Sequence, residues 1–139
     1  MDTKEVNDAI TAQFNMRREA SVSKDMAKLD EVCDKFWVEG WQIVRPSGNP
    51  LTYESQKEMF LSPDVKFISS ELVGINSTKI FANGAAAVVV YTTHDKFEYK
   101  GTANDDIAVF SATLEKTDAG WKFVHLHRAT GKKPESTSG

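Results

Sequence analysis

Two of the three histidines of this 139-residue chain, His125 and His127, lie two residues apart near its end. Successive side chains of a β-strand point to opposite faces, so a strand over residues 121–130 would place both histidines on one face, beside Trp121 and Phe123. Imidazole gains or loses a proton near neutral pH. If this face lines a cavity, it is the best place in the sequence for ligand binding or proton transfer. The alternative is that both histidines are hydrogen-bonded core or interface residues.

The apolar run of residues 85–99 supplies further polar groups for such a cavity. Its alternation offers Tyr91 and Thr93 on one face, or Thr92 and His94 on the other. If Tyr91 and Thr93 point inward, the last strand can bring a histidine close to them. A phenol and an imidazole together suit binding of a small molecule, or acid–base catalysis without a metal.

Three consecutive polar residues, Asn104, Asp105 and Asp106, crowd the start of another predicted strand, near the rim of the expected cavity. An aspartate in apolar surroundings has a raised pKa and can accept a proton, which makes Asp105 a candidate catalytic residue. The alternative is that Asn104 and Asp105 form a turn or cap contact, as these residue types often do.

The wall of the cavity is expected to come from the first half of the chain. Residues 36–45 are rich in aromatic and β-branched residues, which predicts a strand with Trp41 and Arg45 on one face. Thr52 can cap a short helix whose inward stripe includes Tyr53. We expect Trp41, Tyr53 and Arg45 to contact a ligand there.

The three histidines could together supply three nitrogen ligands, as a catalytic zinc site requires. His125 and His127 form a His-x-His pair, and His94 would be the third ligand. Their order and neighbours match no strong zinc pattern, so we expect no metal and no other cofactor.

The bulk composition is that of a globular domain, with 40% hydrophobic and 27% charged residues. A net charge of −3 argues against a nucleic-acid partner. No apolar run reaches transmembrane length, and the N-terminus does not resemble a signal peptide. The single cysteine, Cys33, excludes an internal disulfide and fits a reducing compartment. We expect a soluble cytoplasmic protein, or one of an organelle stroma if a targeting segment has been removed.

The start of the chain has the apolar spacing of helices, and its end has the patterns of strands. The spacing of apolar residues predicts one helix over residues 3–19 and a second that Ser21 or Ser23 caps. From residue 65 onward four strands are expected, with a type I′ hairpin turn at Asn83-Gly84. The predicted strands cover residues 65–81, 85–99, 105–116 and 121–130. This order predicts one α+β domain over residues 1–130, followed by a flexible polar tail over residues 131–139.

The local sequence resembles the SnoaL-like and nuclear transport factor 2-like superfamily over roughly residues 3–130. The resemblance rests on the element order, on Phe36-Trp37 leading from an acidic helix into a strand, on Arg45-Pro46-Ser47-Gly48, and on Gly120-Trp121 opening a last strand with histidines near its end. Two segments, Arg45–Pro50 and Asn104-Asp105-Asp106, also resemble a small family of uncharacterised algal and cyanobacterial proteins within it. The resemblance implies a curved antiparallel sheet wrapped around three helices as a cystatin-like cone with an internal pocket.

The resemblance also implies a small-molecule ligand in the cone, and it favours His127 over His125 as the catalytic residue, with Tyr91 and Asp105. The superfamily includes acid–base enzymes of the isomerase, dehydratase and hydrolase kinds, and iota-class carbonic anhydrases. In those anhydrases hydroxyl residues follow the histidines, where this chain has Arg128 and Ala129. The fold also hosts non-catalytic association modules, and its sheet face commonly pairs two subunits, so a homodimer is expected.

Overall fold

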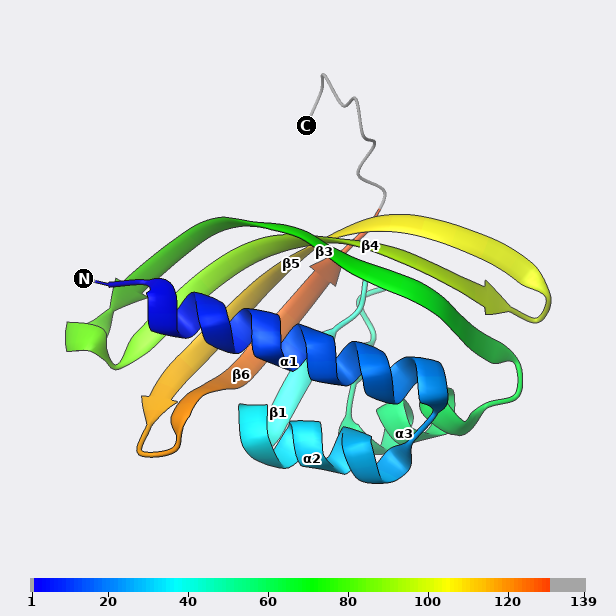
Figure 1. The fold of residues 1–139 in the computed structure, drawn as a ribbon, viewed down its shortest axis with the longest axis horizontal. Helices are drawn as coiled ribbons and strands as arrows, with labels where there is room; N and C mark the ends of the chain where they lie inside the picture. The colour runs from blue at the N-terminus through cyan, green and yellow to red at the C-terminus, as the bar shows by residue number, and fades with distance from the viewer. Residues whose placement is uncertain (1, 131–139) are drawn as a thin grey trace, which may run out of the picture.

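The computed structural model describes residues 2–130, which form helices packed against one curved β-sheet (Figure 1). This arrangement confirms the predicted α+β class. The predicted tail lies outside the described residues. The helices are α1 (Lys4–Ser23), α2 (Met26–Phe36) and α3 (Tyr53–Leu61), and the strands are β1 (Trp37–Val44), β2 (Pro50–Leu51), β3 (Val65–Phe81), β4 (Ala86–Tyr99), β5 (Thr102–Thr117) and β6 (Gly120–Ala129), with a short 3-10 turn, η1 (Ala82–Gly84), between β3 and β4.

The junction between α1 and α2 differs from the prediction. Ser21 and Ser23 both lie inside α1, which ends because Lys24 adopts a left-handed conformation with a φ of 52°. The Lys24 backbone N–H donates to the carbonyls of Ala20 and Ser21, and so satisfies the end of the helix. Asp25 then caps α2, with its carboxylate accepting from a backbone N–H of the first turn. The predicted serine cap is therefore wrong.

The sheet has the strand order β2-β1-β6-β5-β4-β3. Strands β3 to β6 form an antiparallel meander, as predicted. The strand between the helices, β1, adds to this antiparallel meander by pairing with β6 in the parallel direction. A parallel pair needs a long connection, and α3 with the meander provides it.

The hairpin between β3 and β4 has the predicted turn chemistry. Asn83 and Gly84 have φ values of 57° and 88°, and the Ala85 N–H donates to the Ala82 carbonyl over 3.1 Å. Positive φ at both central residues is what a type I′ turn requires. Strand β3 also changes register between Leu72 and Gly74, which agrees with the bend expected there.

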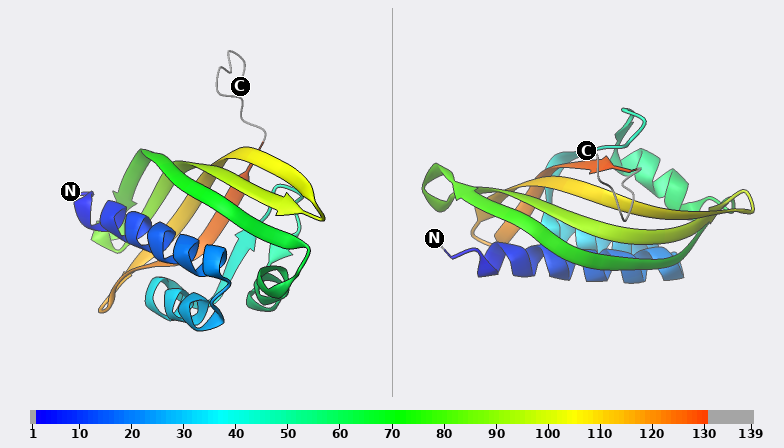
Figure 2. Two further views of the ribbon diagram at one scale, coloured as in Figure 1. Left: turned by 45° about the vertical axis from the view of Figure 1, so that its right-hand side comes forward. Right: turned by 90° about the horizontal axis from the view of Figure 1, so that it is seen from above.

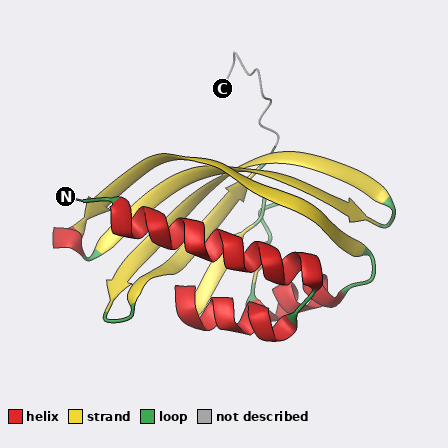
Figure 3. Ribbon diagram, viewed as in Figure 1, coloured by secondary structure: helices red, strands yellow, loops and turns green. Residues whose placement is uncertain are grey.

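The sheet arches over α1 and α2, so it has a helix-covered face and an open face (Figures 1 and 3). Helix α1 runs diagonally across the helix-covered face (Figure 2, left). The Trp37 ring stacks on Phe123 with 4.6 Å between centroids. The core between the layers contains Val6, Ile10, Val32, Phe36, Ile43, Val89, Tyr91, Ala112, Leu114, Phe123 and Leu126.

A β-bulge at Val124 divides β6 into two halves that face opposite ways. Phe123 pairs with Leu114, whereas His125 pairs with Thr113. Leu114 and Thr113 are consecutive and point to opposite faces, so Phe123 and His125 do as well. The prediction that the histidines share the face of Trp121 and Phe123 is wrong, because the extra residue of the bulge interrupts the alternation of side chains between the two faces.

Candidate functional site

The predicted catalytic residues do not converge, because Tyr91 and His127 lie on opposite faces of the sheet. Tyr91 pairs with Phe110, which pairs with Arg128, and all three therefore share the helix-covered face. His127 pairs with Ser111 on the open face. Tyr91 is only 3% exposed, whereas His127 is exposed. His125 is half-buried on the open face as well.

The third predicted catalytic residue, Asp105, also lies on the open face. Its carboxylate contacts the Nε2 atom of His94, and both side chains are accessible to solvent. The neighbouring Asn104 side chain donates to the Thr102 carbonyl, so a local contact of the kind considered as the alternative is made by Asn104 but not by Asp105. Within residues 2–130, no three His, Cys, Asp or Glu side chains gather closely enough to hold a metal ion.

Arg45 binds its own turn. Its Nε atom donates to the Asn49 carbonyl over 3.3 Å, and its backbone N–H donates to the same oxygen over 3.2 Å. The guanidinium therefore holds the 45–49 turn closed after β1.

The helix-covered face carries a polar cluster centred on Asp95. Its carboxylate accepts hydrogen bonds from the Ser70 hydroxyl over 2.5 Å, from Thr93 over 3.0 Å and from the Arg128 guanidinium over 3.2 Å. Arg128 also lies 4.0 Å from the Asp106 carboxylate. Thr93 is 1% exposed, so these groups meet at the edge of the core.

Arg17 reaches the same cluster from α1. It follows Gln13 at a spacing of four residues, on the stripe that α1 buries with Ile10. Burial lowers the pKa of its guanidinium, and the nearby Cys33, Tyr91 and Asp95 raise it in part. Arg17 is half-buried and lies near residues of both α2 and β4.

Burial raises the pKa of the Tyr91 phenol, and Arg17 opposes that change. Tyr91 is thus protonated at neutral pH, and its hydroxyl is available to donate a hydrogen bond. Its ring stacks on Phe110, with 5.0 Å between centroids and an interplanar angle of 10°. The Arg128 guanidinium lies over the other ring of this pair, 5.9 Å from the Phe110 centroid.

Further polar groups are enclosed beside this cluster. Gln13 is 3% exposed and Gln56 is fully buried. The Gln56 amide nitrogen lies 4.0 Å from the Cys33 sulfur, and its oxygen has no hydrogen-bond partner within the described part of the chain. Buried polar groups usually have partners, so this interior is more polar than a simple hydrophobic core.

Sequence reasoning missed Arg17, Asp95 and Arg128. Asp95 could have been found, because it follows Thr93 by two residues and so shares the face predicted for Tyr91 and Thr93. Arg17 could have been found from its spacing to Ile10 and Gln13. Arg128 could not, because only the bulge at Val124 turns it to the helix-covered face.

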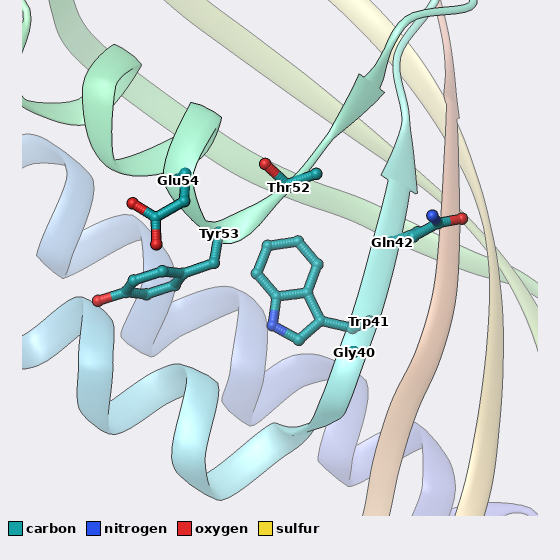
Figure 4. Close-up of a pocket in the computed structure, with 6 residues that line it drawn as sticks. All are labelled: Gly40, Trp41, Gln42, Thr52, Tyr53 and Glu54. Atoms are coloured by element: carbon teal, nitrogen blue, oxygen red, sulfur yellow. The ribbon is translucent and has the colours of Figure 1, made fainter.

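The two predicted aromatic residues Trp41 and Tyr53 do come together, in a surface hollow of about 320 Å³ (Figure 4). The Trp41 indole comes from β1, and the Tyr53 ring comes from the first residue of α3, whose cap is Thr52 as predicted. The hollow is lined by Gly40, Trp41, Gln42, Thr52, Tyr53 and Glu54.

None of the helices in residues 2–130 is long and apolar enough to cross a membrane.

Comparison with solved structures establishes the nuclear transport factor 2-like fold, which is also called cystatin-like. An NTF2-like protein of unknown function from Prochlorococcus is 24% identical and covers 96% of this chain and 95% of its own, with a TM-score of 0.72. A putative calcium/calmodulin-dependent kinase II association domain from Exiguobacterium sibiricum is 12% identical over 96% and 98% of the two chains, with a TM-score of 0.70. The association domain of C. elegans CaMKII is 21% identical over 93% and 100%, with a TM-score of 0.64.

No curated protein matches the sequence. One family model does match, over residues 10–138, and its description is "protein of unknown function (DUF3804)". The chain belongs to this family, DUF3804.

Proposed function

We propose that the protein binds a small molecule between α1 and the helix-covered face of the sheet, beside Arg17, Tyr91 and Asp95. The observation that carries the proposal is the pair formed by Arg17 and Tyr91. Tyr91 is 3% exposed and Arg17 is half-buried, and neither hydrogen-bonds to another side chain in residues 2–130. Partly desolvated donors without side-chain partners cost free energy, which a bound ligand would recover.

The balance of donors and acceptors supports an anionic ligand, such as a small carboxylate. The Asp95 oxygens already accept from Ser70, Thr93 and Arg128. Arg17 and Tyr91 remain as donors. A ligand oxygen that carries negative charge would satisfy both, and the stacked rings of Tyr91 and Phe110 would contact its apolar part.

Binding fits this geometry better than acid–base catalysis by the predicted set. His127 and Asp105 lie on the open face, away from Tyr91. Asp95 already accepts hydrogen bonds from Arg128, Ser70 and Thr93, so its carboxylate is occupied.

A panel of small carboxylates and their matched amides, followed by NMR chemical-shift changes, tests this proposal. We expect saturable shifts at Arg17 and Tyr91 with carboxylates. Arg17→Gln should weaken binding by about tenfold, the value of one charged hydrogen bond. Lys57→Gln, an exposed change on α3, is the control. If no compound shifts Arg17 or Tyr91, the proposal is wrong.

A second candidate function is homo-oligomeric association through the open face of the sheet. No helix of residues 2–130 covers this face in Figures 1 and 3. The pairing and side-chain alternation of β4 and β5 place four half-buried apolar residues on the open face, namely Val88, Val90, Ile107 and Val109. Two structures of this fold are named as association domains, which fits a second copy of this chain as the partner.

Light scattering at micromolar concentration tests the association. The unmodified protein should have at least twice the monomer mass, and Val90→Glu should reduce it to the monomer because it buries a charge in the contact. Ala12→Glu, an exposed change on α1 at the other face of the sheet, is the control for added negative charge. A monomeric unmodified protein would exclude this second function.

A further inference from the structure

The hollow of Trp41 and Tyr53 lies at the surface, apart from the polar cluster around Asp95. Two aromatic residues, Trp41 and Tyr53, line it, and Figure 4 shows the Trp41 indole next to the Tyr53 ring. Gly40 contributes no side chain at its edge, and a φ of 79° favours glycine at that position. The hollow is thus open enough for a small organic group.

Contacts with neighbouring residues fix the side chains of both Trp41 and Tyr53. The Tyr53 hydroxyl donates to the Asp30 carboxylate over 2.5 Å, so a residue of α2 fixes the ring of α3. This hydrogen bond raises the pKa of Tyr53 to about 12. The Trp41 ring contacts Trp37, with 5.0 Å between centroids. Rings that are already ordered lose little conformational entropy when a ligand binds.

The charge at the hollow is negative. Glu54 is the charged residue of the lining, and Figure 4 shows its carboxylate next to the Tyr53 ring. None of the ion pairs within residues 2–130 involves Glu54. Asp30 adds a second carboxylate behind Tyr53, and no lysine or arginine lines the hollow.

We propose that this hollow binds an organic cation, namely an alkylated ammonium group seated against Trp41 and Tyr53, with Glu54 as its counter-charge. The faces of tryptophan and tyrosine rings attract cations, and alkylated ammonium groups carry both positive charge and apolar surface. A neutral ligand of the same shape gains only the apolar contact. The site is separate from the anion site of the proposed function, and either can exist without the other.

Choline and 3,3-dimethyl-1-butanol provide the test, because they have the same shape and differ in that a carbon replaces the charged nitrogen. Each is titrated into the full-length protein while NMR follows the assigned indole N–H of Trp41. We expect a saturable shift with choline and binding of the alcohol weaker by about two- to fivefold or more. Glu54→Gln should weaken choline binding by a similar factor and leave the alcohol unchanged.

Glu58→Gln, an exposed change on the same helix outside the hollow, is the matched control and should not alter choline binding. Glu54 is exposed as well, so the test variant should fold as the unmodified protein does. Equal binding of the two probes would overturn the proposal, since the hollow would then be apolar only. The absence of a saturable shift at Trp41 with choline would overturn it too.

Discussion

The Arg128 guanidinium lies 3.2 Å from the Asp95 carboxylate, although Arg128 belongs to β6 and Asp95 to β4, with β5 between them. Their side chains are 22% and 20% exposed. The pair therefore links two strands that do not hydrogen-bond to each other, across β5, at the edge of the core. Several expectations depend on it and on the bulge that orients Arg128.

Replacing either partner of this pair should destabilise the fold. Arg128→Ala leaves Asp95 with two hydroxyl donors and no hydrogen-bonded cation, and we expect a loss of about 2 kcal/mol in the free energy of unfolding. Asp95→Ala should have a similar effect. In urea denaturation the double variant should lose less than the sum of the two single losses. Strictly additive losses would mean that the two side chains do not interact.

The bulge at Val124 predicts opposite outcomes for neighbouring residues of β6. Leu126→Ala removes a side chain that is 5% exposed, and it should cost about 2–5 kcal/mol. His127→Ala alters an exposed side chain, and it should change stability by less than about 0.5 kcal/mol in the monomer. Chemical denaturation of both variants measures this. A larger loss of stability for His127→Ala than for Leu126→Ala would indicate a strand without the bulge, with His127 facing the core.

The sequence predicted most of the helices and strands, but not the change of face that the bulge at Val124 causes in β6. Hydrophobic periodicity and turn residues were sufficient for the helices and for the β3–β4 hairpin, because those signals are local. The bulge depends on how β6 pairs with β5, and the sequence of one strand alone does not determine that pairing. A period-two interpretation therefore placed His127 inside and Leu126 outside, and it missed Arg128.

The candidate site was predicted in part, for the same reason. Tyr91 and Thr93 follow an uninterrupted alternation and do lie on the helix-covered face. Asp105 pairs with His94 on the open face, a contact between strands that spacing along the chain does not encode. The spacing of Arg17 to Ile10 and Gln13 predicts its position on the inward stripe of α1, but its approach to Asp95 depends on how α1 crosses the sheet.

Tyr91→Phe should not destabilise the unliganded protein. The side chain is 3% exposed and its hydroxyl hydrogen-bonds to no other side chain in the described residues, so its removal leaves no partner unpaired. We expect the free energy of unfolding at neutral pH to be unchanged or higher by up to about 1 kcal/mol. A loss of more than that would show that the hydroxyl has a partner in the folded protein.

The raised pKa of Tyr91 predicts a loss of stability in alkali. An unperturbed tyrosine has a pKa of 10.0, whereas burial raises that of Tyr91 in the fold. Above pH 10 the unfolded chain therefore binds fewer protons than the folded chain, and stability falls as pH rises. Tyr53, with its pKa raised to about 12, adds to the same trend.

Urea denaturation between pH 9 and 11, compared for the unmodified protein and Tyr91→Phe, checks this dependence. The variant should lose less stability per pH unit, because one of the two contributing phenols is gone. Identical slopes would contradict an interior position for the Tyr91 phenol.

A crystal structure of the protein grown with the carboxylate that binds best in the NMR panel tests the central claim most directly. The account predicts ligand density between α1 and the helix-covered face, with a carboxylate oxygen accepting from both the Arg17 guanidinium and the Tyr91 hydroxyl. Arg17 paired directly with Asp95, and no ligand density between Arg17 and Tyr91, would contradict it.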